Sequence, residues 1–181
     1  MQRDNFNLDE ALAMLARTPA SLGALLAGAP ERWLLATEGA DEWSPRDVIV
    51  HLINGERTNW IPRARHILAG EQRPFDPFDR AAEISASQDS AAGALLALFA
   101  ELRRENIAAL EAMSLSSADL DRTGQHPEFG EVRLAQLLAT WVVHDLNHLG
   151  QIVRTMAKVY AAAIGPWRAY LPIVEERGSN S

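Results

Sequence analysis

The segment WVVHDLNHLGQI, residues 141–152, combines a helical repeat of apolar residues with two histidines four positions apart. Positions i and i+4 lie on one face of an α-helix, with Cβ atoms about 5–6 Å apart. His144 and His148 can therefore share one metal ion at the usual metal–nitrogen distance of about 2.0–2.1 Å. The apolar neighbours predict that this face points into the protein interior, where an uncompensated imidazole is costly.

The apolar repeat continues on both sides of this segment and predicts a long helix from about Arg133 to Ala163. Gly165 and Pro166 are typical of a helix end. We expect the aromatic segment 167–174 to pack back on the other helices, and we expect residues 176–181 to fray.

Three more helices are predicted upstream. The first begins at Leu8, restarts at the capping pair Thr18 and Pro19 and ends near Gly28. The second begins at SPRD, residues 44–47, which resembles a capping box with proline in the first turn.

Pro62 should kink this second helix before it ends near residue 68, because proline removes a backbone donor and clashes with the preceding turn. The third helix is predicted over residues 89–113. The connections are residues 29–43, a loop from residue 70 to 77, and residues 114–131. The last contains two glycines and a proline, so we expect no regular structure there.

Composition agrees with these helices. The chain has 181 residues, of which 48% are hydrophobic, and β-branched residues are sparse. This length is close to that of one domain, and no internal repeat is visible. We therefore predict an all-α fold, a four-helix bundle, as a single domain over residues 1–175. Bundles of this kind build metal or cofactor sites from facing helices.

Charge and composition exclude several classes of function. The chain carries 17 basic and 24 acidic residues, a net charge of −7, and Arg103–Arg104 is its only adjacent basic pair. Nucleic acid is therefore a poor candidate partner. We expect Arg103 and Arg104, with Glu101 and Glu105, to form a solvated helix face. No apolar run approaches the roughly 18 residues that a membrane span needs, and no apolar signal core precedes Glu10, so the default expectation is a cytoplasmic protein.

His51 is the candidate for a third metal ligand. It lies two turns into the second predicted helix, where apolar residues on several sides indicate burial. Gly55, one turn later, would leave free volume beside its imidazole. Alone, such a histidine is more often a hydrogen-bonded core residue. His66 lies beyond the expected kink, and His126 lies in a loop from which it could approach the site; we include neither.

Three segments also carry a family resemblance: WSPRDVIVHL at 43–52, GQHPEFG at 124–130 and WVVHDLNHLGQI at 141–152. They resemble the DinB/YfiT-like family of bacterial metal-binding helical bundles, and the helix order fits over nearly the whole chain. The resemblance implies a bundle, often a homodimer, that holds one divalent metal ion through His51, His144 and His148. It implies zinc, nickel or iron, with one or more positions open to water. Characterised relatives include transferases and isomerases that use low-molecular-weight thiols such as bacillithiol or mycothiol.

The leading hypothesis for the reaction is transfer of a metal-bound low-molecular-weight thiol to an electrophilic small-molecule substrate. A divalent metal deprotonates a coordinated thiol, and because this chain has no cysteine the thiol must arrive as a co-substrate. Metal-hydroxide hydrolysis ranks lower, since helical geometry turns Asp145 and Glu56 away from the ligands and no general base is visible. A non-catalytic metal-binding stress-response protein is the third reading. We assign no catalytic residue.

Several other polar and aromatic side chains each allow two interpretations. Gln151 and Asn147 could support a ligand or contact the substrate, or could simply be satisfied polar groups in a bundle. Three arginines on the second helix could bind carboxylates of a thiol cofactor, but a solvated face is favoured: Arg57, Arg63 and Arg65. Three tryptophans could wall a pocket, although core packing is the commoner role: Trp43, Trp60 and Trp141.

Overall fold

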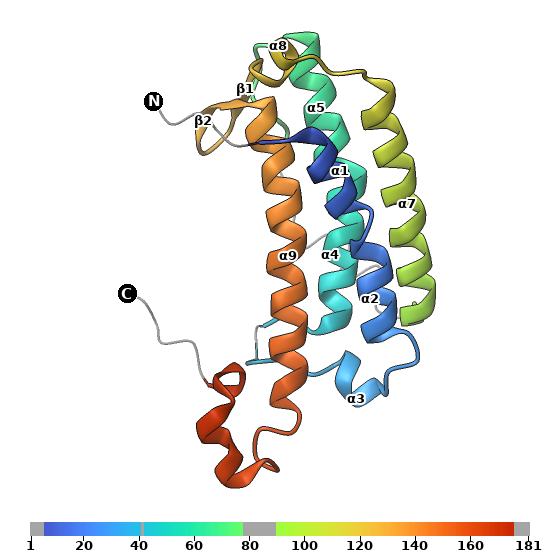
Figure 1. The fold of residues 1–181 in the computed structure, drawn as a ribbon, viewed down its shortest axis with the longest axis vertical. Helices are drawn as coiled ribbons and strands as arrows, with labels where there is room; N and C mark the ends of the chain where they lie inside the picture. Colours follow the sequence, from blue (N-terminus) through green and yellow to red (C-terminus); the bar gives the residue numbers. More distant parts are fainter. Residues whose placement is uncertain (1–5, 41, 78–89, 176–181) are drawn as a thin grey trace.

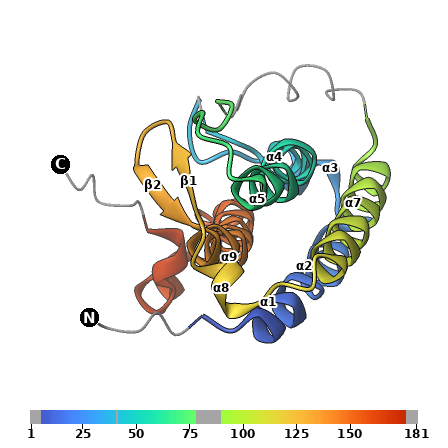
Figure 2. The ribbon, with the colours of Figure 1, turned by 90° about the horizontal axis from the view of Figure 1, so that it is seen from above.

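Four columns of helix run alongside one another in the computed structural model, which describes residues 6–40, 42–77 and 90–175 (Figure 1). The first column is α1 (Leu8–Leu15) with α2 (Thr18–Leu26), and the second is α4 (Pro45–Thr58) with α5 (Trp60–Ala69). The other two are α7 (Ala92–Ala112) and α9 (Leu134–Lys158). Seen from above, α4/α5 and α1/α2 each lie between α7 and α9 (Figure 2). The predicted all-α four-helix bundle is confirmed.

The start of α4 forms as the sequence predicts. The Ser44 hydroxyl accepts a hydrogen bond from the Asp47 N–H, and the Asp47 carboxylate accepts one from the Ser44 N–H. This capping box satisfies two donors that a helix start otherwise leaves without partners. It fixes the direction in which α4 carries His51 into the bundle.

The second column is interrupted rather than smoothly bent. Asn59, with φ −106° and ψ −67°, separates α4 from α5 three residues before Pro62. The break lies before the proline because a proline ring clashes with the carbonyl four residues earlier and leaves that carbonyl without its N–H donor. For Pro62 that carbonyl belongs to Thr58, the last residue of α4.

The prediction that residues 114–131 lack regular structure was wrong. They contain α8 (Ser117–Leu120) and most of a hairpin formed by β1 (Thr123–His126) and β2 (Gly130–Arg133). The strands pair antiparallel, with Thr123 opposite Arg133 and His126 opposite Gly130. Each strand has only four residues, too few for a clear alternation of apolar and polar residues. The connection 29–43 likewise holds a short helix, α3 (Glu31–Leu34).

The C-terminal segment departs from its prediction too. The last long helix ends at Lys158, and two short 3₁₀ helices follow, η1 (Gly165–Tyr170) and η2 (Pro172–Val174). The expected packing of aromatic residues does not occur, because Trp167 is 68% and Tyr170 79% exposed, whereas Val174 is buried. The tail 176–181, which we expected to fray, lies outside the described residues, as does the predicted start of the third helix at residue 89.

The core has two apolar parts with a polar layer between them. One part packs residues of α2, α4, α7 and the end of α9, including Leu22, Ile49, Phe99 and Ile152. The other packs residues of α1, α5, α7 and the start of α9, including Leu15, Trp60, Leu110 and Leu138. Along the columns, several buried polar residues lie between these two sets, and His51 lies within the first set on α4; the residues between the sets are Thr18, Glu56, Arg103, Asp145 and His148. Over the described residues, no helix has the length and apolarity needed to cross a membrane.

Candidate metal centre

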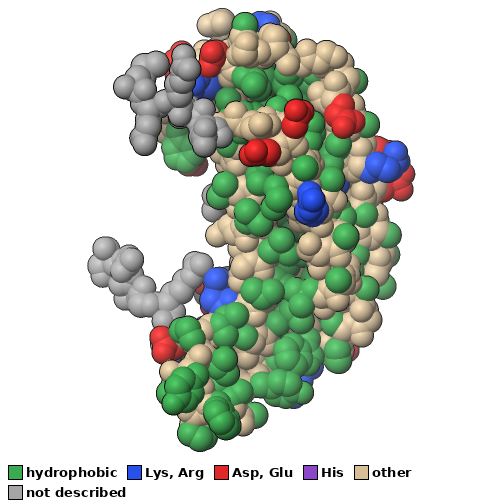
Figure 3. All heavy atoms as spheres, viewed as in Figure 1, with side chains coloured by type: hydrophobic (Ala, Val, Ile, Leu, Met, Phe, Trp, Pro, Cys, Tyr) green, Lys and Arg blue, Asp and Glu red, His purple; other side chains and the backbone are tan. Residues whose placement is uncertain are grey.

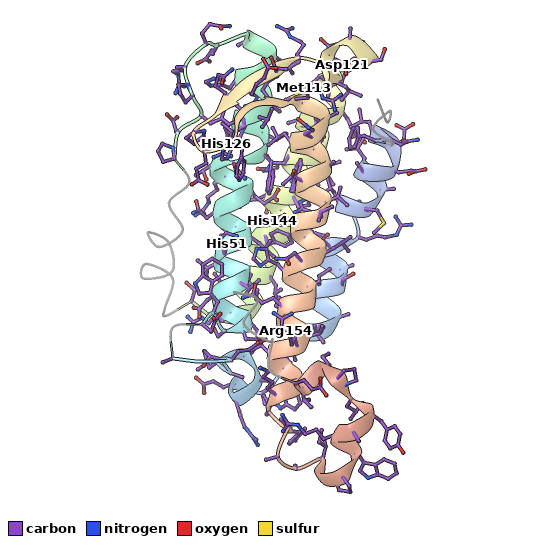
Figure 4. All side chains as sticks on the ribbon, turned by 90° about the vertical axis from the view of Figure 1, so that its left-hand side faces the viewer. His51, Met113, Asp121, His126, His144 and Arg154 are labelled. Carbon is purple, nitrogen blue, oxygen red and sulfur yellow. The ribbon has the colours of Figure 1, made fainter. Side chains whose placement is uncertain are left out.

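Three histidines from two helices meet within the polar layer. His51 comes from α4, and His144 and His148 come from successive turns of α9. The Nε2 atom of His144 lies 3.1 Å from Nε2 of His51 and 3.2 Å from Nε2 of His148. Figure 4 shows His51 and His144 turned toward one another between the two helices. The structure thus brings together the three residues that the sequence singled out.

The spacing of these nitrogens fits a shared metal ion. Two ligands bound tetrahedrally at about 2.0–2.1 Å lie roughly 3.3–3.4 Å apart, and a narrower ligand angle shortens this distance. One potential ligand atom from each histidine lies within 4.8 Å of the other two. Imidazole is a ligand that suits zinc, nickel and iron alike. The donor set therefore fits the kind of ion that the resemblance implies.

Gln151 fixes the orientation of one of these rings. Its Oε1 atom lies 2.8 Å from Nδ1 of His148. An amide oxygen only accepts hydrogen bonds, so Nδ1 of His148 carries the proton and the lone pair is on Nε2, facing the other histidines. Asn147 is exposed on α9, and the suggestion that it supports the site or touches substrate stays a prediction.

Burial keeps the α9 histidines neutral. It lowers the pKa of His144 to about 3, and the neighbouring His148, His51 and Arg103 add to that effect. Burial also lowers the pKa of His148, although Gln151 and the charge of Asp145 oppose the shift. A histidine must be neutral to bind a metal, so both rings are ready as ligands at neutral pH.

Aromatic rings surround the three histidines. The Trp43 ring centroid lies 4.6 Å from that of His51, and the Trp60 centroid lies 5.1 Å from that of His144. The free volume expected beside Gly55 is occupied, because a Cβ there would lie 3.3 Å from Nε1 of Trp60. Trp141 lies fully in the core and stacks on Trp60.

A cavity of about 870 Å³ extends from the histidines toward the β1–β2 hairpin. Trp43 and Trp60 line this cavity, which agrees with the alternative that these tryptophans form the wall of a pocket. The hairpin contributes residues that sequence reasoning left out, since His126 and Glu128 line the same cavity. The signal that could have found them is the GQHPEFG segment, which resembles the family but carries no helical periodicity. The complete lining is Trp43, His51, Gly55, Asn59, Trp60, Arg63, Phe75, Pro77, His126, Pro127, Glu128, Phe129, Val132, Gln136, Leu137, Thr140, His144 and His148.

Behind the histidines lies a buried ion cluster that the sequence did not reveal. Arg103, predicted to be solvated, is only 1% exposed. Its Nη2 donates to Glu56 Oε1 at 2.8 Å and to Asp145 Oδ1 at 3.0 Å. Burial opposes the charge of this guanidinium, but the two carboxylates outweigh it and raise the pKa of Arg103. Its neighbour Arg104 is exposed, as predicted.

This cluster also fixes the two carboxylates nearest to the histidines in sequence. Asp145 further accepts a hydrogen bond from the Thr18 hydroxyl at 2.7 Å, and Glu56 accepts one from Trp141 Nε1 at 3.0 Å. Neither carboxylate lines the cavity. Both were expected to face away from the histidines, and in the structure both are engaged by Arg103.

The chain matches both a protein-family model and solved structures. The model of the DinB superfamily matches residues 14–152. Among solved structures, the chain is similar to YfiT from Bacillus subtilis, a probable metal-dependent hydrolase with an unusual four-helix bundle topology. That similarity has a TM-score of 0.74 and 23% identity, and it covers 91% of this chain and 93% of the other. At this identity it shows the fold alone. None of the curated proteins compared with the chain matches it.

Proposed function

The chain belongs to the DinB superfamily, and from that premise we propose that it is a metal-dependent enzyme that acts on a small molecule bound in its cavity. His51, His144 and His148 would hold one divalent ion, zinc, nickel or iron. The observation that carries this proposal is the convergence of three Nε2 atoms, from two helices, in the wall of a cavity of about 870 Å³. YfiT, which has the same fold, is itself described as a probable metal-dependent hydrolase.

The site is better suited to catalysis than to a structural role. Structural zinc sites usually have four protein ligands, whereas catalytic sites have three and an open position. The described residues bring three histidines together and no fourth His, Cys, Asp or Glu joins that group. His126 lies in the cavity wall but outside the group.

We propose that the reaction is transfer of a low-molecular-weight thiol to an electrophile. A bound divalent ion would supply an acidifying charge that lowers the pKa of a thiol or water. The sulfur forms a bond to an electrophilic carbon, the bond from that carbon to the leaving group breaks with its electron pair, and the thiol proton passes to solvent. The chain's own residues orient the reactants, and the Trp43 and Trp60 rings provide apolar surfaces beside His51 and His144.

Hydrolysis is the second candidate, and one observation favours it. Glu128 lines the cavity and could act as a general base toward a water molecule. Thiol transfer ranks first because the two carboxylates closest to the ligands in sequence, Glu56 and Asp145, are held by Arg103 and have no free role as a base.

Two measurements test the proposal. Elemental analysis of protein purified without a nickel column should find about one divalent ion per chain, and a cobalt-substituted sample should change its visible spectrum when a thiol is added. A thiol-transfer screen should then show activity for the wild type that His148→Ala loses. If no cellular thiol alters the cobalt spectrum, thiol transfer is wrong, and hydrolysis assays decide the reaction.

Removal of the metal separates an enzyme from a structural metal protein. In a closed structural site the binding free energy is folding free energy, so chelation unfolds the protein. Here two apolar core regions and the Arg103 cluster already join the same helices. We expect chelation to abolish activity while the helical circular dichroism persists at room temperature. Unfolding on chelation would contradict the open site.

A further inference from the structure

Arg63, on α5, lies in the cavity wall and is half-buried. Its guanidinium lies 5.1 Å from the centroid of the Phe75 ring, and its Nη2 donates to the backbone oxygen of Asp76 at 3.3 Å. Over the described residues, no carboxylate forms an ion pair with it. Burial lowers the pKa of Arg63, with the charge of Asp76 opposing the shift. A cation that has lost part of its hydration, without a paired carboxylate, favours an anion from outside the chain.

His126, on β1, contacts the same phenyl ring. Its Nδ1 accepts hydrogen bonds from the backbone N–H groups of Glu128 and Phe129, at 3.1 and 3.3 Å. These bonds assign the proton of the neutral ring to Nε2, which is therefore a donor and not a base. The ring stacks on Phe129, with centroids 4.4 Å apart, and is nearly perpendicular to the Phe75 ring, with centroids 6.2 Å apart. Burial and the charge of Arg63 lower its pKa, against the charge of Glu128, so the ring stays neutral.

The third polar group of this region is an acceptor. Asn59 lines the cavity one helical turn before Arg63, and within the described part of the chain nothing donates to its buried Oδ1 atom. Residues four apart share a helix face, so this oxygen and the guanidinium lie on the same side of the column. A buried acceptor without a donor is costly, and a ligand hydroxyl or N–H would satisfy it.

We propose that Arg63 and His126 bind the carboxylate of a small organic acid, that Asn59 accepts a hydrogen bond from its hydroxyl or N–H group, and that its reacting end extends to His51, His144 and His148. One guanidinium and one neutral donor, with Glu128 nearby, suit a single negative charge better than a doubly charged phosphate. The substrate class therefore is a hydroxy- or amino-substituted carboxylic acid. The role of the three histidines rests on the proposed function, but the carboxylate subsite does not.

The experiment compares a matched pair of probes, 4-hydroxybutyrate and its neutral amide 4-hydroxybutyramide, with inorganic phosphate as a third. Each is titrated into metal-free and zinc-loaded full-length protein, and binding is followed by the imidazole ¹⁵N signals of His126. We expect those signals to report an unprotonated Nδ1. We also expect the carboxylate to bind at least about 10-fold more tightly than the amide, in both forms of the protein.

Two variants locate the subsite. Arg63→Gln should remove the preference for the carboxylate over the amide. Arg65→Gln, an exposed position two residues along the same helix, should leave that preference unchanged. Circular dichroism confirms that both variants fold.

Three results would overturn the proposal: equal binding of the two probes to wild type, an unchanged preference in Arg63→Gln, or tighter binding of phosphate than of the carboxylate. The metal-free titration keeps the two proposals apart. A protein that prefers the carboxylate but binds no metal would retain this subsite and lose the proposed function.

Discussion

The Nδ1 proton of His148 determines which nitrogen faces the other two histidines, and Gln151 holds that proton. Groups that orient a metal-bound histidine typically contribute 10–100-fold to metal affinity. We therefore predict that Gln151→Leu weakens zinc binding by roughly 10–100-fold, measured by competition with a chromophoric chelator.

The matched control for this variant is Asn147→Leu, on an exposed position of the same helix, which should leave zinc affinity unchanged. Gln151→Glu keeps an acceptor at the same place and should bind zinc at least as well as wild type. Equal affinities for Gln151→Leu and Asn147→Leu would show that Gln151 does not orient the ligand.

The pKa of His144 makes the stability of the metal-free protein depend on pH. Burial lowers this pKa from its ordinary 6.5 to about 3 in the folded state, so below pH 6.5 the unfolded chain binds a proton that the folded chain does not. Stability is therefore greatest above about pH 6.5 and falls as the pH drops toward 3. We predict a loss of roughly 1–2 kcal/mol between pH 7 and pH 5, from urea unfolding with a chelator present.

His144→Gln tests the assignment of this effect, because glutamine removes the titrating group. Its unfolding free energy should fall less between the same two pH values than that of wild type. An identical pH dependence in the two proteins would place the effect elsewhere in the chain.

At the scale of elements, Arg103 joins four helix columns. Its guanidinium, on α7, contacts Glu56 on α4, Asp145 on α9 and the backbone oxygen of Leu15 at the end of α1. Removing one partner of a buried ion cluster leaves uncompensated charges, which costs about 3–5 kcal/mol. We predict a loss of that size for Arg103→Met, measured by urea unfolding.

Arg104→Met is the control, since that side chain is 69% exposed and its ion pairs lie at the surface. Exposed substitutions of this kind usually change stability by less than about 0.5 kcal/mol. Arg103→Lys, which keeps the charge but loses the planar fork, should fall between the two. Equal unfolding free energies for Arg103→Met and Arg104→Met would refute the structural role of the cluster.

The distance along the chain between partners explains what the sequence could and could not predict. His144 and His148 are four residues apart, so helical geometry alone placed them together. Arg103 meets partners 42, 47 and 88 residues away, and its neighbours Glu101, Arg104 and Glu105 form an ordinary solvated face. Nothing local distinguishes the one arginine of that run that turns inward.

The hairpin was also missed because its contacts are with residues far away in the chain. Gly124 shows how closely the hairpin packs on these residues. A Cβ on Gly124 would lie 2.8 Å from Cγ1 of Ile67 and 2.9 Å from the Phe75 ring, so β1 packs directly on α5. Overpacking a close contact typically costs about 1–3 kcal/mol. We predict that Gly124→Ala destabilises the protein by that amount in urea unfolding.

The control, Gly23→Ala, lies inside α2 with open space around the added methyl group. It should be neutral or stabilise the protein by up to about 1 kcal/mol, the usual gain in helix propensity. Because β1 ends at His126, Gly124→Ala should also weaken carboxylate binding, which Gly23→Ala should not. A Gly124→Ala protein as stable as Gly23→Ala would contradict the close packing of β1.

At the scale of the whole molecule, the polar layer lies between two apolar core regions, and the cavity opens onto it from the side of the hairpin. The Arg103 cluster faces the α1/α2 and α7 columns, and the histidines face the cavity beneath the hairpin. We propose that residues 1–175 form one domain, since both core regions draw on helices from the whole described chain. Within it, the ion cluster stabilises α4 and α9 on the side opposite to the cavity.

Among the described residues, nothing covers one face of α9. Val143, Leu146 and Val153 form an apolar stripe at helical spacing, with side chains 63%, 49% and 38% exposed. The hairpin and the C-terminal segment project from the same side of α9 (Figure 1), and Figure 3 shows apolar side chains gathered over the C-terminal segment. A groove of about 700 Å³ between α1 and α9 adjoins the stripe.

The family resemblance implies a bundle that is often a homodimer, and we propose that this stripe contacts its counterpart in a second copy of the chain. A twofold dimer buries the same patch on both subunits, so one charge placed in the patch is introduced twice. Leu146→Glu should therefore yield monomers in light scattering coupled to size exclusion. Leu98→Glu, at an exposed apolar position of α7, introduces the same charge away from the stripe and should remain dimeric. A monomeric wild type at tens of micromolar would overturn the proposal, and so would a dimeric Leu146→Glu, because two buried carboxylates without partners would cost more than the apolar contact supplies.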